Sequence, residues 1–183
     1  MSHEFSTVMV SGMRRALLEL GWLDQVKAEA SAPAKEALDA PEGAKFHPGP
    51  AMNEVVDVVA RLHGLEGAER FMRSVTANSM EGIVAPLARV YRALKGDSPR
   101  VLLAQLDSLL KVAARGLKAA WLEESERAGV LSIVYPEPTS LPVGYAWRGV
   151  VQHLLVFCEA NGGVEVIDFG EGGRTVRLRV KWD

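Results

Sequence analysis

The sequence predicts an α+β fold, with a helical N-terminal portion followed by the order strand, strand, helix, strand, strand. Over the first two-thirds of the chain, apolar residues recur at intervals of three and four, which is the spacing along one face of a helix. In the last third, short β-branched segments alternate apolar with polar residues, as half-buried strands do. No internal repeat divides the chain. We therefore expect a single domain over residues 1–183, helical over about 5–115 and sheet-containing over about 116–183.

The helices of the N-terminal portion are expected to end where glycine or proline follows the periodic residues. Gly21 offers a left-handed stop to the first helix, and Pro33 disfavours helix in the residue before it. Pro86 should break or kink one helix, and Ser98 suits the N-cap of the last. The stretch 41–50 holds three prolines and two glycines, which predicts a loop. The expected helices cover residues 7–20, 22–32, 52–62, 66–77, 80–94 and 99–113.

Two strands are expected ahead of the C-terminal helix. Residues 130–135 are β-branched and aromatic and are followed by Pro136, which indicates a strand. Residues 117–124 are ambiguous, because their alanines favour continued helix. Residues 125–129 would equally serve as the turn of a hairpin whose first strand contains Trp121. The local pattern leaves both readings open.

The C-terminal residues predict a helix followed by a hairpin. Residues 144–160 return to the helical period, and the glycines at 162 and 163 end them. Residues 164–169 and 175–182 flank a glycine-rich turn at 170–173. In the last strand, the apolar and polar sets alternate strictly: Val176, Leu178, Val180 and Trp182 against Thr175, Arg177, Arg179 and Lys181. One face of this strand should therefore be buried, and the other wet and basic.

Composition and charge exclude several classes of function. The formal net charge is -2, from 21 basic and 23 acidic residues, so no long-range field would gather nucleic acid onto the chain. The single cysteine, Cys158, cannot form an intramolecular disulfide and fits the reducing cytoplasm. The N-terminus lacks the pattern of a signal peptide, and no apolar run is long enough to cross a bilayer.

The reactive side chains are dispersed and form no catalytic motif. The four histidines include no pair at the spacing of two metal ligands on one helical face. Cys158 falls on the apolar side of its helix, which favours a packing role, with an acylated or redox-active thiol as the alternative. We therefore expect a protein without enzymatic activity, metal or cofactor.

The basic face of the last strand is the strongest candidate for a binding surface. Arg177, Arg179 and Lys181 stand at alternate positions and so point to the same side. At a sheet edge, such cations would only protect the strand from unwanted pairing. The functional alternative is a patch for an acidic partner protein.

The segment from Gly144 to Gly149, together with the closing strand 176–182, resembles an uncharacterised myxobacterial protein family of about this size. More distantly, it is similar to the fold shared by haem nitric-oxide sensors, vinyl-reductase-type small-molecule-binding domains and the Golgi transport (TRAPP) subunits. The resemblance covers most of the chain. It implies a four-stranded antiparallel sheet covered by helices, an apolar cavity between the two layers and frequent homodimerisation. It also favours reading residues 117–124 as a strand.

The chain departs from these families in two motifs. Haem-binding relatives carry a Tyr-x-Ser-x-Arg motif that grips the haem propionates, and Tyr91, Tyr135 and Tyr145 are not followed by that pattern here. His63 is the residue that would serve as a lone axial ligand, but its place just before Gly64 more simply makes it a polar helix end. The terminal hairpin also lacks the cysteines that small-molecule-binding relatives often carry. We therefore expect no haem.

These features predict a cytoplasmic adaptor or sensor module. It would act through protein–protein contacts, with or without a small apolar ligand between helices and sheet. The alternative is a carrier or receptor whose function is to hold a small hydrophobic molecule.

Overall fold

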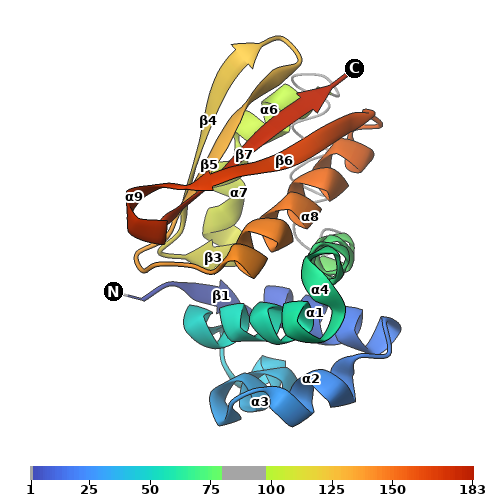
Figure 1. The fold of residues 1–183 in the computed structure, drawn as a ribbon. Coiled ribbons are helices and arrows are strands. Elements are labelled where there is room, and N and C mark those ends of the chain that lie inside the picture. The colour runs from blue at the N-terminus through green and yellow to red at the C-terminus, as the bar shows by residue number, and fades with distance from the viewer. Residues whose placement is uncertain (1, 80–97) are drawn as a thin grey trace.

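The structure, a computed structural model, describes residues 2–79 and 98–183 (Figure 1). A helical N-terminal portion is followed by a portion built on an antiparallel sheet, which confirms the predicted α+β class. The predicted order strand, strand, helix, strand, strand is also confirmed. The expected helix over residues 80–94, with its break at Pro86, lies outside the described residues.

Most elements begin and end within a few residues of the expected positions. The helices are α1 (Thr7–Glu19), α2 (Leu23–Glu29), α3 (Ala32–Asp39), η1 (Pro41–Gly43), α4 (Gly49–Ser79), α6 (Pro99–Ala104), α7 (Leu106–Ala113), α8 (Leu141–Phe157) and the single turn α9 (Gly170–Gly173). The strands are β1 (Glu4–Ser6), β2 (Phe46–Pro48), β3 (Ala114–Arg115), β4 (Lys118–Ser125), β5 (Ala128–Val134), β6 (Gly162–Phe169) and β7 (Thr175–Trp182).

The larger sheet has the strand order β4-β5-β7-β6, with every neighbouring pair antiparallel. Of the ambiguous residues 117–124, all but Leu117 belong to β4, in which Trp121 pairs with Leu131 of β5. The hairpin reading is therefore confirmed. Alanine content does not decide the local state here, because a partner strand supplies the hydrogen bonds and the packing.

One face of the larger sheet is covered by helices and the other is exposed. Helices α7 and α8 lie against the first face (Figure 1), where Leu131, Ile133 and Leu178 are fully buried. Within the described residues, no helix covers the opposite face, and Leu122 there is 68% exposed. The burial of β7 alternates as the sequence predicts from Val176 to Trp182, with Arg177 on the exposed side. The prediction was wrong for Thr175, which is buried at the start of the strand.

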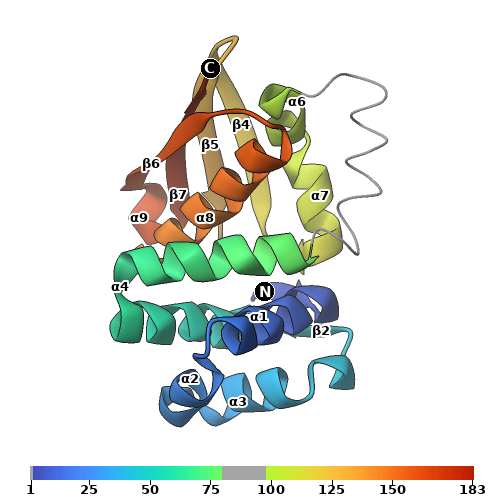
Figure 2. The ribbon, with the colours of Figure 1, turned by 90° about the vertical axis from the view of Figure 1, so that its right-hand side faces the viewer.

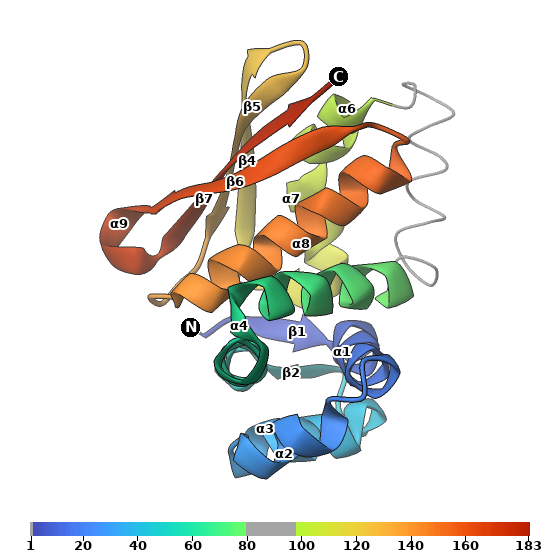
Figure 3. The same ribbon diagram turned by 45° about the vertical axis from the view of Figure 1, so that its right-hand side comes forward.

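A second, three-stranded sheet with the order β2-β1-β3 was not predicted. Strand β1 lies between the N-terminal helices and α8 (Figure 3). The expectation of a loop over 41–50 was wrong for residues 46–48, which form β2. These residues pair with Glu4–Ser6, far away in the sequence, so their local glycine and proline content does not reveal the strand.

Helix α4 consists of two arms joined at Gly64. The expected helix end at Gly64 is confirmed, since its φ of 75° and ψ of 175° interrupt the helical geometry and the chain turns back there. Figure 2 shows the two arms lying one above the other, with the second arm against α8. The close approach depends on Gly149 of α8, because a Cβ there would lie 2.2 Å from the carbonyl oxygen of Glu69.

The main cluster of buried apolar side chains draws on both portions of the chain. It includes Val10 of α1, Phe71 of α4 and Leu178 of β7. That the two portions form one domain stays a prediction. Within residues 2–79 and 98–183, no helix has both the length and the apolar character that crossing a bilayer requires.

The substitution Gly149→Ala should destabilise the protein, because the added methyl group meets the backbone of Glu69 and Arg73. We expect the free energy of unfolding to fall by about 1–3 kcal/mol, measured by denaturant titration. Gly163→Ala is the matched control, since nothing lies within 4 Å of the added atom there. The control should change stability by less than about 0.5 kcal/mol. Equal stabilities for the two variants would contradict the close contact between α4 and α8.

Candidate functional site

The candidate site is an apolar cavity of about 100 Å³ at the junction of the two portions. Its walls come from β1, α1, both arms of α4, α7, α8 and the residue that follows β5. Among its lining residues are Phe5 of β1, Met13 of α1, Leu110 of α7 and Ala146 of α8. A molecule in this cavity would therefore contact both portions at once.

Methionines are concentrated around the cavity. The chain has 6 methionines, and Met9, Met13, Met52 and Met72 line this space. Methionine is unbranched and polarizable, so it adapts its shape to irregular contents more readily than leucine or valine does. The cavity wall is therefore deformable as well as apolar.

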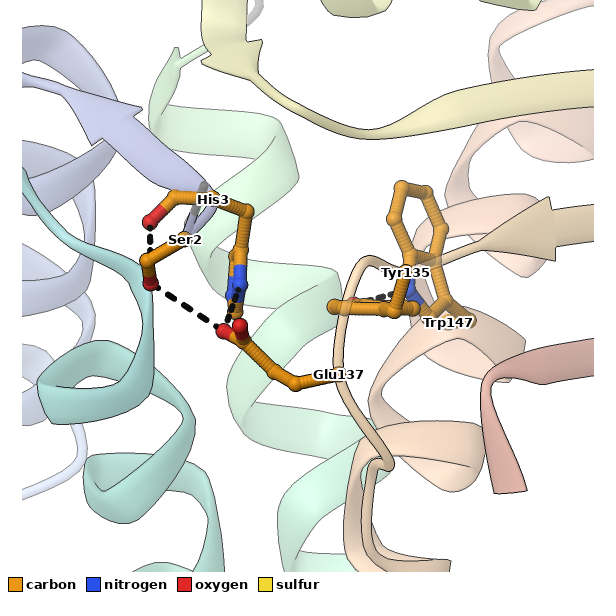
Figure 4. A network of polar contacts seen from close by, with 5 residues as sticks. All are labelled: Ser2, His3, Tyr135, Glu137 and Trp147. Atoms are coloured by element: carbon orange, nitrogen blue, oxygen red, sulfur yellow. Dashed lines mark hydrogen bonds and ion pairs between the residues drawn. The ribbon is translucent and has the colours of Figure 1, made fainter. Parts of the chain in front are cut away.

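Tyr135 and Trp147 form a buried hydrogen bond at the cavity wall (Figure 4). The indole Nε1 of Trp147 donates to the hydroxyl oxygen of Tyr135 at 2.7 Å. Burial raises the pKa of the Tyr135 phenol above its ordinary value, and the hydrogen bond from Trp147 opposes this effect only in part. The phenol therefore stays neutral and keeps its proton.

A polar pair beside Tyr135 joins the N-terminal residues to the loop after β5 (Figure 4). His3 is 0% exposed, and its Nδ1 lies 2.7 Å from Oε1 of Glu137. The hydroxyl of Ser2 donates to the same carboxylate oxygen at 3.2 Å. The His3 ring packs edge-on against Phe5 and Tyr135. This pair could not be predicted from the sequence, because a histidine and a glutamate so far apart in the chain give no local signal.

The other three histidines do not line the cavity and lie on separate elements. The Nε2–H of His47 donates to the backbone oxygen of Pro41 at 2.7 Å. His63 stacks on Trp22 with ring centroids 3.9 Å apart, and His153 is half-buried on α8. No group of three or more metal-ligand side chains was found among the described residues.

Cys158 lies at the end of α8 in a small buried cluster with Leu102 and Leu109. It does not line the cavity. The packing role predicted for this thiol is therefore consistent with its position, and the thiol does not meet the pair of His3 and Glu137.

The predicted basic face lies on the exposed side of the larger sheet. Strand β7 is an interior strand between β5 and β6, so protection of a sheet edge does not explain its cations. Nε of Arg177 lies 2.7 Å from Asp168, and Nε of Arg179 lies 3.9 Å from Glu124. Lys181 is exposed and has no ion pair within the described part of the chain.

Comparison with known proteins shows the fold alone. No family model matches the sequence, and no curated protein matches it. Among solved structures, an unliganded Fe(II) H-NOX protein from K. algicida has a TM-score of 0.66 at 10% identity, covering 97% of this chain and 96% of that one. An oxygen-binding H-NOX domain related to soluble guanylate cyclases has a TM-score of 0.63 at 15% identity, covering 97% and 95% of the two chains.

These neighbours confirm the predicted fold likeness to haem nitric-oxide sensors. A third solved structure comes from work on modulating the haem redox potential through protein-induced porphyrin distortion. It has a TM-score of 0.62 at 14% identity and covers 96% of this chain and 99% of that chain. The likeness to the myxobacterial family, to vinyl-reductase-type domains and to Golgi transport subunits stays a prediction.

The residues around the cavity do not fit a haem. Among the described residues no histidine, the axial ligand expected from the likeness to haem sensors, lines it, and residues 80–97 contain no histidine in their sequence. Tyr135 is followed by Glu137 and Thr139 in place of the serine and arginine of the propionate-binding motif. A carboxylate at this position would repel propionates. The cavity of about 100 Å³ is also smaller than the roughly 300–1,000 Å³ typical of drug-sized and cofactor ligands.

The stability of the protein should depend on the protonation of His153. Burial, and then the positive charge of Arg73, lower the pKa of His153 in the folded state below its ordinary value of 6.5. Protonation therefore favours the unfolded chain, and stability present above about pH 6.5 is lost as the pH falls through the lowered pKa.

His153→Gln should remove this contribution, so that the free energy of unfolding falls less between about pH 7 and pH 5 than in the wild type. Arg73→Gln should give an intermediate dependence of stability on pH, because it removes the positive charge near His153 and leaves the ring buried. Denaturant titrations at each pH measure the slopes. An unchanged slope in His153→Gln would refute the assignment.

Proposed function

We propose that this chain is a non-enzymatic sensor module whose ligand is a small apolar molecule other than haem. The observation that carries the proposal is the apolar, methionine-rich cavity at the junction of the two portions. Because both portions form its walls, a bound molecule changes the contacts between them. The surface of the protein can then report that the cavity is filled.

The size and lining of the cavity define the class of ligand. An engineered apolar cavity of roughly 150 Å³ in another protein stays dry and binds benzene or xenon. The cavity here has about 100 Å³ and walls of flexible methionines, so a molecule of the size of benzene fits after a small adjustment. Among the described residues, no lysine or arginine lines it, which disfavours an anionic ligand.

The alternative function is a carrier or receptor for a small hydrophobic molecule. A carrier of long acyl chains needs a larger pocket than this one. A sensor needs only a small molecule at a junction, so the size of the cavity favours the sensor.

The dispersal of the reactive groups supports a non-enzymatic role, since His3 and Glu137 meet without Cys158. The single cysteine and the net charge of -2 support the cytoplasm and a role without nucleic acid.

Protein contacts are the second part of the proposal. The exposed face of the larger sheet carries Arg177, Arg179 and Lys181 on β7 and the 68% exposed Leu122 on β4. Two of these cations already have acidic neighbours, and Lys181 is the one that would meet an acidic protein segment. Homodimerisation stays a prediction.

Benzene should bind the purified protein and shift the methyl NMR signals of the four cavity methionines. Leu110→Ala enlarges the cavity, so it should strengthen benzene binding while lowering the free energy of unfolding by about 2–5 kcal/mol. Leu122→Ala is the matched control, because Leu122 is exposed and should leave benzene binding unchanged. Titrated haem should produce no Soret band of ligated iron. The proposal fails if benzene moves no methionine signal in either the wild type or Leu110→Ala.

Lys181→Glu should weaken binding of a poly-glutamate peptide several-fold at low salt, because it replaces the attraction with repulsion at one point of the face. Lys45→Glu is the control, as this exposed lysine precedes β2 in the other portion and makes the same change in net charge. Fluorescence anisotropy of a labelled peptide measures both. Equal weakening by the two variants would show that net charge, rather than the sheet face, attracts the peptide.

A further inference from the structure

The Tyr135 hydroxyl places an unused hydrogen-bond donor at the wall of the apolar cavity. Its oxygen accepts the indole N–H of Trp147, and indole is a donor only. The phenol proton is therefore not used in that bond, and no acceptor for it was found within the described residues. Tyr135 is 3% exposed, so water does not readily take this role either.

The other polar groups at the cavity offer less to a ligand. The hydroxyl of Thr76 donates to the backbone oxygen of Met72 at 2.7 Å. Ser79 also has a buried hydroxyl without a partner among the described residues, but its Oγ lies close to the backbone of Gly12 in the contact between α1 and α4. Asn53 is partly exposed. Tyr135 is therefore the donor best placed to meet a molecule inside the cavity.

We propose that the phenol of Tyr135 selects the ligand, so that the cavity takes a small apolar molecule with one neutral acceptor, such as a ketone or ether oxygen, in preference to a hydrocarbon of the same shape. This inference rests on the proposed sensor function. A buried donor left unpaired costs about 1–3 kcal/mol, and a ligand oxygen that accepts the proton relieves this cost. The same effect underlies the strong rejection of analogues that leave a binding site's polar groups unpaired.

A neutral acceptor fits the charges around Tyr135 better than a carboxylate does. The acidic side chain of Glu137 lies two residues further along the chain and is held by His3 next to the Tyr135 ring. No cation among the described lining residues offsets a second negative charge. A ligand carboxylate would be desolvated without compensation, whereas a ketone oxygen needs only the phenol proton.

The test compares cyclopentanone with methylenecyclopentane, two probes of nearly the same shape that differ in the acceptor oxygen. Binding of each probe is monitored by the methyl NMR signals of the cavity methionines. The measured quantity is the ratio of the two dissociation constants. Comparing this ratio between variants cancels the different hydration of the two probes. Because Trp147 could donate in place of a missing phenol, the comparison is made in a Trp147→Phe background. There, adding Tyr135→Phe should reduce the preference for cyclopentanone about tenfold.

Tyr145→Phe in the same background is the matched control, since Tyr145 does not line the cavity, and it should leave the ratio unchanged. The infrared carbonyl band of bound cyclopentanone gives a second readout. It should lie at lower frequency in Trp147→Phe than in the double variant, because a hydrogen bond weakens the carbonyl. Binding of both probes with a ratio and a band that do not respond to Tyr135→Phe overturns this inference and leaves the sensor function standing. Failure of both probes to bind the wild type refutes the sensor function itself.

Discussion

The contact between the second arm of α4 and α8 is the constraint on which the rest of the structure depends. It joins the helical portion to the helix that covers the larger sheet, and it is close because Gly149 presents no side chain to the backbone of Glu69. The turn at Gly64 brings the second arm of α4 to this position. With these two helices held together, the remaining space at the junction is a cavity of about 100 Å³.

The polar groups of the junction are arranged so that the cavity itself stays apolar. Nδ1 of His3 pairs with Glu137 beside the cavity, while its Nε2 is buried without a partner among the described residues. Trp147 donates to the oxygen of Tyr135 at the cavity wall. The fold is that of haem-sensor structures, yet no histidine lines the cavity among the described residues, and the propionate-binding motif is replaced after Tyr135. The same architecture therefore encloses a small apolar cavity in place of a haem pocket, since the chemistry of a site depends on its side chains rather than on the fold.

Much of the fold could be predicted from residue periodicity, because helices and paired strands with one buried face impose a strict spacing on their apolar residues. The alternation in β7 and the helix end at Gly64 are of this kind. Strand β2 was missed because its partner β1 lies far away in the sequence. The cavity was expected from a family resemblance, but its methionine lining and the pair of His3 and Glu137 could not be derived from spacing.

Local residue patterns thus sufficed for the class of fold, the order of the main elements and the dispersal of reactive groups along the chain. Packing between distant segments was needed to show that β7 is an interior strand, that His3 is buried against Glu137 and that Tyr135 faces an apolar cavity. The physical reason is that periodicity depends on residues close together in the chain, whereas a cavity depends on contacts between distant segments. Periodicity records which side of an element is buried, whereas a cavity and its polar groups are defined by what the other elements place opposite that side.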